Sequence, residues 1–239
     1  LIVFLVSFYQ SPSQESYNEH LWLDVNYSSF ISPKTALIGD IGFRYQFDQA
    51  SWSQFILRPG IKYSLSSNWK LLGGIGYFDK FTESQDNDTE LRFYQGALAK
   101  LSFSRSFSVE NYFRLEERFL TNNAFLFSFR LRNQVTVEYN LVNKVQRKIS
   151  IPLSGEAFFD LDEITSDSFQ RGRLRFYTGI DYRYYDRWRI VALYNFQGNK
   201  GGNEDDFSKT EVMYRVRFYV YLKRSSSFIN KHKKRAVTQ

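Results

Sequence analysis

The sequence contains no cysteine, which excludes a disulfide framework, a thiolate zinc site and a cysteine nucleophile. It also has only two histidines, four prolines and one methionine. No run of about 18 apolar residues occurs, so no helical membrane span is predicted. Aromatic residues are abundant instead: 24 Phe, 17 Tyr and 4 Trp make up 19% of the chain, which favours strands over helices. The sequence therefore predicts a folded, aromatic-rich β protein.

The length of 239 residues fits one all-β domain, and no change in composition marks a second one. The net charge of +7 comes mostly from the end of the chain, because residues 223–239 contain basic residues and no acid. We expect this basic tail (223–239) to be solvated or to contact a polyanion such as lipid headgroups. The start of the chain, LIVFLVSFY followed by Ser-Pro-Ser, resembles the end of a signal peptide. Residues 1–13 are therefore predicted to be a signal-peptide remnant, with a buried first strand as the alternative, and residues 14–222 to be the folded domain.

From His20 onward, apolar and polar residues alternate with a period of two. Between Phe125 and Tyr139 one face carries mainly Phe, Leu, Val and Tyr, and the other carries Ser, Arg, Gln, Thr and Glu. Side chains on a strand alternate between faces in this way, whereas a helix needs a period near 3.6. Eleven such runs can be counted, at 20–31, 35–47, 53–65, 69–78, 89–102, 107–118, 125–140, 148–161, 171–184, 188–196 and 209–222.

Most of these runs have the nine to eleven residues that a tilted strand needs to cross a bilayer. Short connections alternate with long polar ones (79–88, 162–170 and 197–208), and aromatic residues cluster near the ends of the runs. Both features are typical of outer-membrane barrels. The predicted fold is an all-β, transmembrane, antiparallel up-and-down β-barrel. Because bacterial barrels have an even number of strands, we expect about twelve, with ten as the alternative.

Several segments carry a resemblance to a known family. They include HLWLDVNYS, ELRFYQGALAKLSF with SFSVENYFRLEERF, RLRNQVTVEYNL, IPLSGEAFFDL and RGRLRFYTGIDYRYYDRWRIVALYNF. Together they resemble an uncharacterised Gram-negative family of outer-membrane β-barrels, of the type called domain of unknown function 2490. The resemblance implies the barrel fold and a location in the outer membrane of a Gram-negative bacterium. It implies no activity, and the basic tail beyond the last strand departs from the usual aromatic end of such barrels.

The polar face of the runs carries many arginines and fewer acids. Fixed guanidinium charge lowers the barrier for anion entry, so one hypothesis is a narrow, anion-preferring pore that admits small anionic solutes. The other is a lumen filled and stiffened by ion pairs, in a structural barrel of the envelope. The candidate basic ladder consists of i, i+2 pairs on alternate runs, Arg130 with Arg132, Arg173 with Arg175 and Arg215 with Arg217. Its candidate acidic partners are Glu116, Glu138, Glu156 and Asp181.

Two alternatives remain open, an outer-membrane barrel hydrolase of the lipase or deacylase type and a soluble ligand-binding β-barrel. His20 and His232 are the only histidines, and neither G-x-S-x-G nor H-E-x-x-H occurs, so we expect no enzyme activity and no catalytic residue. No metal site or cofactor is predicted. The expected partners are outer-membrane lipid and lipopolysaccharide, with no nucleic acid. The sequence names no protein partner.

Overall fold

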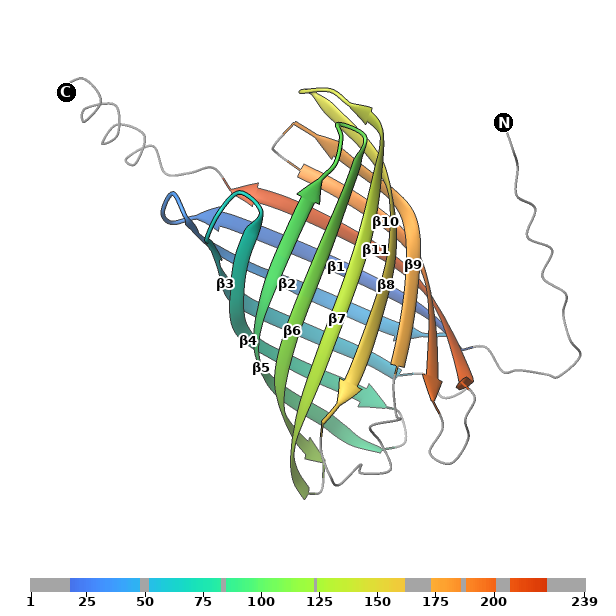
Figure 1. Cartoon of the computed structure of the whole chain (residues 1–239). Coiled ribbons are helices and arrows are strands. Elements are labelled where there is room, and N and C mark those ends of the chain that lie inside the picture. Colours follow the sequence, from blue (N-terminus) through green and yellow to red (C-terminus); the bar gives the residue numbers. More distant parts are fainter. Residues whose placement is uncertain are drawn as a thin grey trace, which may run out of the picture.

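The computed structural model describes residues 18–47, 52–82, 85–122, 124–161, 173–185, 188–200 and 207–222. Within these residues the chain forms eleven strands that close into one barrel (Figure 1). The predicted signal-peptide remnant (1–13) and basic tail (223–239) lie outside the described residues. The strands are β1 (Asn18–Phe30), β2 (Thr35–Gln46), β3 (Trp52–Ser64), β4 (Trp69–Thr82), β5 (Gln85–Ser102), β6 (Phe107–Asn122), β7 (Ala124–Asn143), β8 (Arg147–Asp160), β9 (Arg173–Tyr184), β10 (Trp188–Lys200) and β11 (Phe207–Leu222).

The barrel closes between its first and last strands. Each strand pairs antiparallel with the next one along the chain, but β1 and β11 pair in parallel, from Asn18 opposite Glu211 to Ser29 opposite Leu222. The closed all-β barrel predicted from the sequence is confirmed, and the described strands number eleven, between the ten and twelve that were expected. The expectation of an even number does not hold here, because a parallel pair closes an odd number of strands.

Tight turns gather at one end of the barrel, here called the turn end. Three of them, at 31–34, 65–68 and 103–106, begin with the same device, a serine hydroxyl that accepts backbone N–H bonds. Ser32 accepts from Thr35 at 2.9 Å, and Ser66 and Ser104 do the same in the next two turns. Serine favours such turns because its hydroxyl replaces a backbone acceptor. The opposite end, here called the loop end, carries the β2–β3, β4–β5, β6–β7, β8–β9 and β10–β11 connections.

The β4–β5 connection is shorter than expected. The sequence predicts a long polar loop over 79–88, but β4 continues to Thr82 and β5 begins at Gln85. Lys80 lies opposite Asp88 in this extension, and the Thr89 hydroxyl donates to the Asp79 carboxylate at 3.2 Å. Polar residues extend a hairpin here because strand pairing satisfies their backbone groups. The period-two hydrophobic pattern stops where neither face is apolar, so it misses such an extension.

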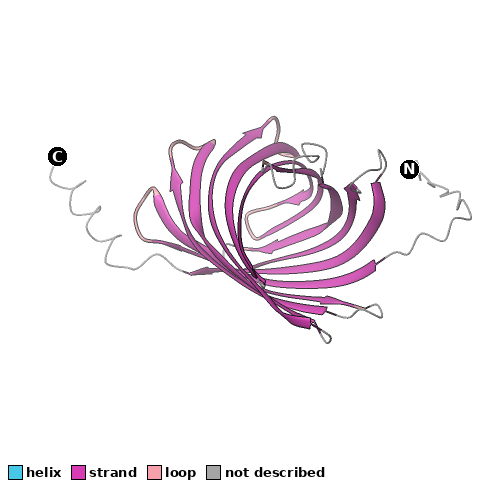
Figure 2. Ribbon diagram, turned by 90° about the horizontal axis from the view of Figure 1, so that it is seen from below, coloured by secondary structure: helices cyan, strands magenta, loops and turns pink. Residues whose placement is uncertain are grey.

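The apolar side chains of the alternating pattern point outward from the barrel wall. On β1, Trp22 and Asp24 are 4% and 3% exposed, whereas Leu23 and Val25 are 44% and 49% exposed. The same alternation of burial continues around the barrel, whose strands wrap around a central space in Figure 2. A soluble barrel has the opposite arrangement, with its apolar side chains inside. In the described part of the chain, no helix is long and apolar enough to cross a membrane.

One side of the outer face is less apolar than the rest. Gln95 of β5 lies 3.4 Å from Glu117 of β6, and Asn111 donates to Asn133 of β7 at 3.0 Å. All four side chains share the outward parity with apolar neighbours such as Phe113. The outer surface of β5, β6 and β7 therefore carries a small polar patch within an apolar belt.

Gly179 permits a close approach between β9 and β10. A Cβ atom at this position would lie only 1.9 Å from the carbonyl oxygen of Ala192. We expect Gly179→Ala to lower the free energy of unfolding by about 1–3 kcal/mol, because the two backbones would have to move apart. Gly73→Ala is the matched control, since its Cβ would meet Tyr94 at 3.6 Å, an ordinary contact. Urea unfolding of both variants measures the difference, and equal stabilities would contradict the prediction.

Candidate functional site

The lumen is the candidate functional site, because most of the ion-paired titratable side chains lie at the inward-facing positions of the strands. All six arginines of the predicted ladder border one cavity of about 380 Å³. Arg130 and Arg132 come from β7, and the other two pairs come from β9 and β11. Alternate strands place the pairs on one side of the lumen, so the spacing predicted from the sequence brings the six together in space.

Two of the four predicted acidic partners bind ladder arginines. Arg132 donates to Glu116 at 2.8 Å and to Glu156 at 2.5 Å, and Arg175 reaches Glu156 at 3.2 Å. Glu116 is 2% exposed and is also 3.1 Å from Arg114. These groups form a central network across β6, β7, β8 and β9. Burial makes each ion pair costly to break, because a carboxylate left alone in this interior has lost its hydration.

The other two predicted acids pair elsewhere. Glu138 binds Lys148 and lies 3.8 Å from Lys100, and Asp181 binds Arg189 at 2.5 Å. Both sites lie toward the turn end of the barrel, away from the ladder. The alternation of faces along each strand predicted that these acids face the lumen. It does not give their position along the barrel axis.

A second network lies toward the loop end. Glu90 binds Arg92 at 2.6 Å and Arg118 at 2.5 Å, and Asp160 binds Arg130 at 2.7 Å. Arg118 also lies 3.7 Å from Asp160, so the network runs continuously from β5 to β8. Asp160 is the last residue of β8, within the run 148–161 that the sequence predicts as a strand. Arginine–carboxylate pairs thus bridge neighbouring strands at this level of the lumen.

Asp24 was not predicted to be part of the site. It is 3% exposed and accepts from Arg215 at 2.5 Å, with Arg217 at 3.8 Å. Asp24 lies on β1 and these arginines on β11, so the ion pair connects the two strands that close the barrel. Because 191 residues separate Asp24 from Arg215, sequence spacing gives no signal of the contact.

Three aromatic side chains also lie among the lumenal arginines. The guanidinium of Arg92 lies 3.7 Å from the ring centroid of Phe78, that of Arg132 lies 4.5 Å from Phe158, and that of Arg44 lies 4.0 Å from Trp22. Such cation–π contacts are attractive and become stronger when water is excluded. The sequence predicts aromatics at the ends of the strands, with Phe78 and Phe158 among them, and the structure instead places these three rings against lumenal arginines; the alternation of faces along each strand could have indicated this.

The main cavity has an excess of positive charge. Among the described residues it is bordered by ten arginines and by three carboxylates, those of Asp40, Glu110 and Glu156. Arg58 is paired with Asp40 of the cavity wall at 2.6 Å, and Arg132 is paired at 2.8 Å with Glu116, which does not border the cavity. Arg44 forms no ion pair with another described residue, and its Nη1 donates to Gln54 at 3.2 Å. The arginines bordering the cavity are Arg44, Arg58, Arg92, Arg114, Arg130, Arg132, Arg173, Arg175, Arg215 and Arg217.

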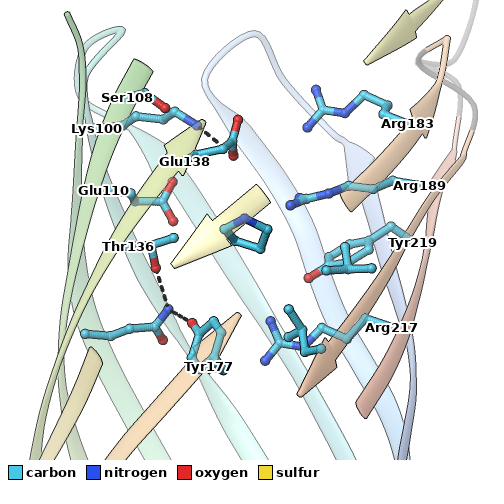
Figure 3. A pocket seen from close by; sticks show the side chains of 14 residues that line it. Lys100, Ser108, Glu110, Thr136, Glu138, Tyr177, Arg183, Arg189, Arg217 and Tyr219 are labelled. Carbon is cyan, nitrogen blue, oxygen red and sulfur yellow. Dashed lines mark hydrogen bonds and ion pairs between the residues drawn. The ribbon is translucent and has the colours of Figure 1, made fainter. Parts of the chain in front are cut away.

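A smaller cavity of about 150 Å³ lies toward the turn end and is shown in Figure 3. Lys100, Glu110 and Glu138 face Arg183 and Arg189 across it. Arg183 forms no ion pair with another described residue, and its Nε is buried without a hydrogen-bond partner. The two cavities share several wall residues and are therefore adjacent along the lumen. The shared residues are Glu110, Gln134, Tyr177, Arg217 and Tyr219.

The histidine considered for a hydrolase lies at the loop end of β1. His20 is 3% exposed, its Nε2 lies 3.9 Å from a Glu211 carboxylate oxygen, and its ring is 5.4 Å from that of Trp52. Glu211 of β11 is therefore the carboxylate that the structure places beside this histidine. Among the described residues, no group of three or more His, Asp or Glu side chains is arranged to hold a metal ion.

A family model described as "Protein of unknown function (DUF2490)" matches residues 19–208. The chain belongs to this family. The match confirms the resemblance to the DUF2490 family itself, and it covers the chain from β1 to the start of β11. Arg130, Arg132, Arg173 and Arg175 of this DUF2490 protein fall inside the matched region, and Arg215 and Arg217 lie beyond it. No curated protein matches the chain.

Proposed function

We propose that this DUF2490 barrel spans the outer membrane of a Gram-negative bacterium and that its narrow lumen favours small anions. The observation that carries the proposal is the main cavity, where ten arginines face three carboxylates. A lumen with fixed positive charge attracts anions and repels cations. No catalytic step is part of the proposal.

The outer surface supports the membrane location. Leu153, Ile180 and Phe176 are 60%, 60% and 53% exposed, and similar side chains cover the outer face of the other strands. Soluble monomers rarely expose such a continuous apolar surface. The strands have 12 to 20 residues, which exceeds what a tilted membrane-spanning strand needs. Lipid, and lipopolysaccharide on the outer leaflet, are the partners that fit this surface.

Aromatic clusters near both ends of the barrel also fit a bilayer. At the turn end, the ring of Trp188 lies 5.4 Å from Tyr184 and 5.6 Å from Tyr182. Toward the loop end, the ring of Phe119 lies 5.8 Å from Phe93 and 4.8 Å from Phe127. Aromatic girdles of this kind mark the two membrane–water interfaces of transmembrane barrels.

The test of the pore is electrical. The refolded chain is inserted into a planar bilayer, and single-channel conductance and reversal potential are recorded under a salt gradient. We expect discrete conductance steps with a reversal potential on the anion-selective side. Cation selectivity would contradict the proposal.

A single-residue change sharpens this test. Arg183→Gln removes a lumenal charge that has no ion-pair partner among the described residues, so the fold keeps its network. We expect the anion-to-cation permeability ratio to fall about twofold. Arg105→Gln is the control, because Arg105 lies in an exposed turn. An equal effect of the two variants would show that the selectivity does not arise in the lumen.

The ion-pair networks favour a second candidate, a filled structural barrel of the envelope. Glu90, Asp160 and Glu116 each hold arginines from neighbouring strands, which stiffens the wall and occupies lumenal space. This candidate predicts a folded protein without conductance. A barrel that changes its gel mobility on heating, yet stays silent in the bilayer, would favour it over the pore.

A further inference from the structure

Positive charge gathers in the lumen around Trp22 of β1. This side chain is 4% exposed, and three guanidinium groups surround its ring. Their Cζ atoms lie 4.0 Å (Arg44), 5.0 Å (Arg175) and 5.2 Å (Arg215) from the ring centroid. They come from β2, β9 and β11, so three strands direct like charges toward one aromatic side chain, and all three arginines border the main cavity.

The charges of the three arginines are compensated unequally. Arg215 binds Asp24 at 2.5 Å, and Arg175 binds Glu156 at 3.2 Å. Arg44 has the neutral side chain of Gln54 and no ion pair with another described residue. A guanidinium withdrawn from bulk water without a counter-ion is costly, and cation–π attraction offsets only part of that cost.

Unused hydrogen-bond donors point to the same place. Trp22 Nε1 and Arg44 Nε are both buried and have no hydrogen-bond partner. Indole and guanidinium nitrogens can only donate, so the group that satisfies them must be an acceptor. An oxyanion offers several acceptor oxygens together with the missing negative charge.

We propose that the main cavity contains a binding site for a small oxyanion, a carboxylate or phosphate group, held by Arg44, Arg175 and Arg215, the three arginines whose guanidinium groups surround the ring of Trp22. The proposal deepens the anion-preferring lumen proposed above and rests on it. The cavity of about 380 Å³ has room for inorganic phosphate or for an acidic monosaccharide bearing a carboxylate. The competing account is a water molecule, because Asp24 Oδ1 is also buried without a partner and water could bridge it to the donors.

Tryptophan emission provides a local readout, because the ring of Trp22 contacts all three arginines of the proposed site. The refolded full chain in detergent is titrated with inorganic phosphate and, separately, with glucuronate, at an ionic strength kept constant with chloride. We expect a saturable change in emission that is lost in Trp22→Phe and retained in Trp69→Phe, since Trp69 lies on the outer face and is 53% exposed. Whichever probe saturates at lower concentration identifies the phosphate or the carboxylate as the preferred group.

Arg44 variants test the charge itself. We expect Arg44→Gln to weaken binding at least tenfold, Arg44→Lys to restore part of it, and Arg105→Gln to leave it unchanged. Heat-dependent gel mobility confirms that each variant is folded. The absence of saturable binding, or binding that is identical in Trp22→Phe or Arg44→Gln, would overturn the site and favour bridging water.

The two proposals fail in different ways. An anion-selective pore without saturable binding would overturn the site and leave the proposed pore standing. Saturable binding lost in Trp22→Phe, in a barrel that does not conduct, would support the site and overturn the pore.

Discussion

Replacing Arg132 with methionine is expected to lower the free energy of unfolding of the barrel by about 3–4 kcal/mol. Arg132 is the shared partner of Glu116 and Glu156, at 2.8 and 2.5 Å, and both carboxylates are buried. Methionine keeps much of the side-chain volume but leaves the two acids competing for fewer cations. The cost stays at the lower end of the range for broken buried pairs, because Arg114 and Arg175 still contact them.

Urea unfolding, followed by the loss of the fast-migrating folded band on a gel, measures this change. Arg105→Met is the control, because that side chain lies in an exposed turn and surface changes usually stay within about 0.5 kcal/mol. Adding Glu156→Gln to Arg132→Met should recover part of the loss, since it removes one of the carboxylates that lost a partner. If Arg132→Met matched the control, the network would contribute little to stability.

The second large effect concerns the closure of the barrel. Leu23 of β1 and Val216 of β11 lie directly opposite each other in the parallel pair, and both face outward. Because the chain has no cysteine of its own, Leu23→Cys with Val216→Cys creates a single possible disulfide. We expect nearly complete intramolecular oxidation of the folded protein and a gain of about 2–4 kcal/mol in stability, since the bond closes a long loop.

The matched control moves one cysteine along β11. Leu23→Cys with Val220→Cys places the second thiol four residues away from the register partner. At about 3.3 Å per residue the two Cα atoms are then too far apart for a disulfide. Non-reducing electrophoresis after mild oxidation distinguishes the two pairs. Efficient cross-linking of the control pair, or none of the first, would contradict parallel closure in this register.

The period-two pattern was sufficient to predict the elements of the barrel. The run from 125 to 140 is the middle of β7, and the run from 209 to 222 is nearly all of β11. The same parity predicted that the six ladder arginines share the lumen. It succeeds because the face of a strand residue depends only on whether its position is odd or even, wherever the strand lies in the barrel.

The pairing of charges could not be predicted in the same way. Which carboxylate meets which arginine depends on the stagger between strands, and no pattern within one strand encodes it. Asp24 binds Arg215 only because β1 lies beside β11, and Glu138 binds lysines because it lies nearer the turn end. The expected strand count of about twelve is close to the eleven described strands. The sequence itself gives eleven runs, and the even-number rule, which assumes antiparallel closure, moved the expectation to twelve.

Because β1 and β11 are parallel, the start and the end of the barrel domain lie at opposite ends of the barrel. β1 starts at the loop end, and β11 finishes at the turn end, on opposite sides of the barrel in Figure 1. An epitope placed just before β1 and another placed just after β11 would therefore be displayed on opposite faces of any sheet of lipid that the barrel crosses. Antibodies added to intact cells would label one epitope and not the other, whereas a barrel free in solution would expose both. Circular permutation would likewise need a linker as long as the barrel is tall.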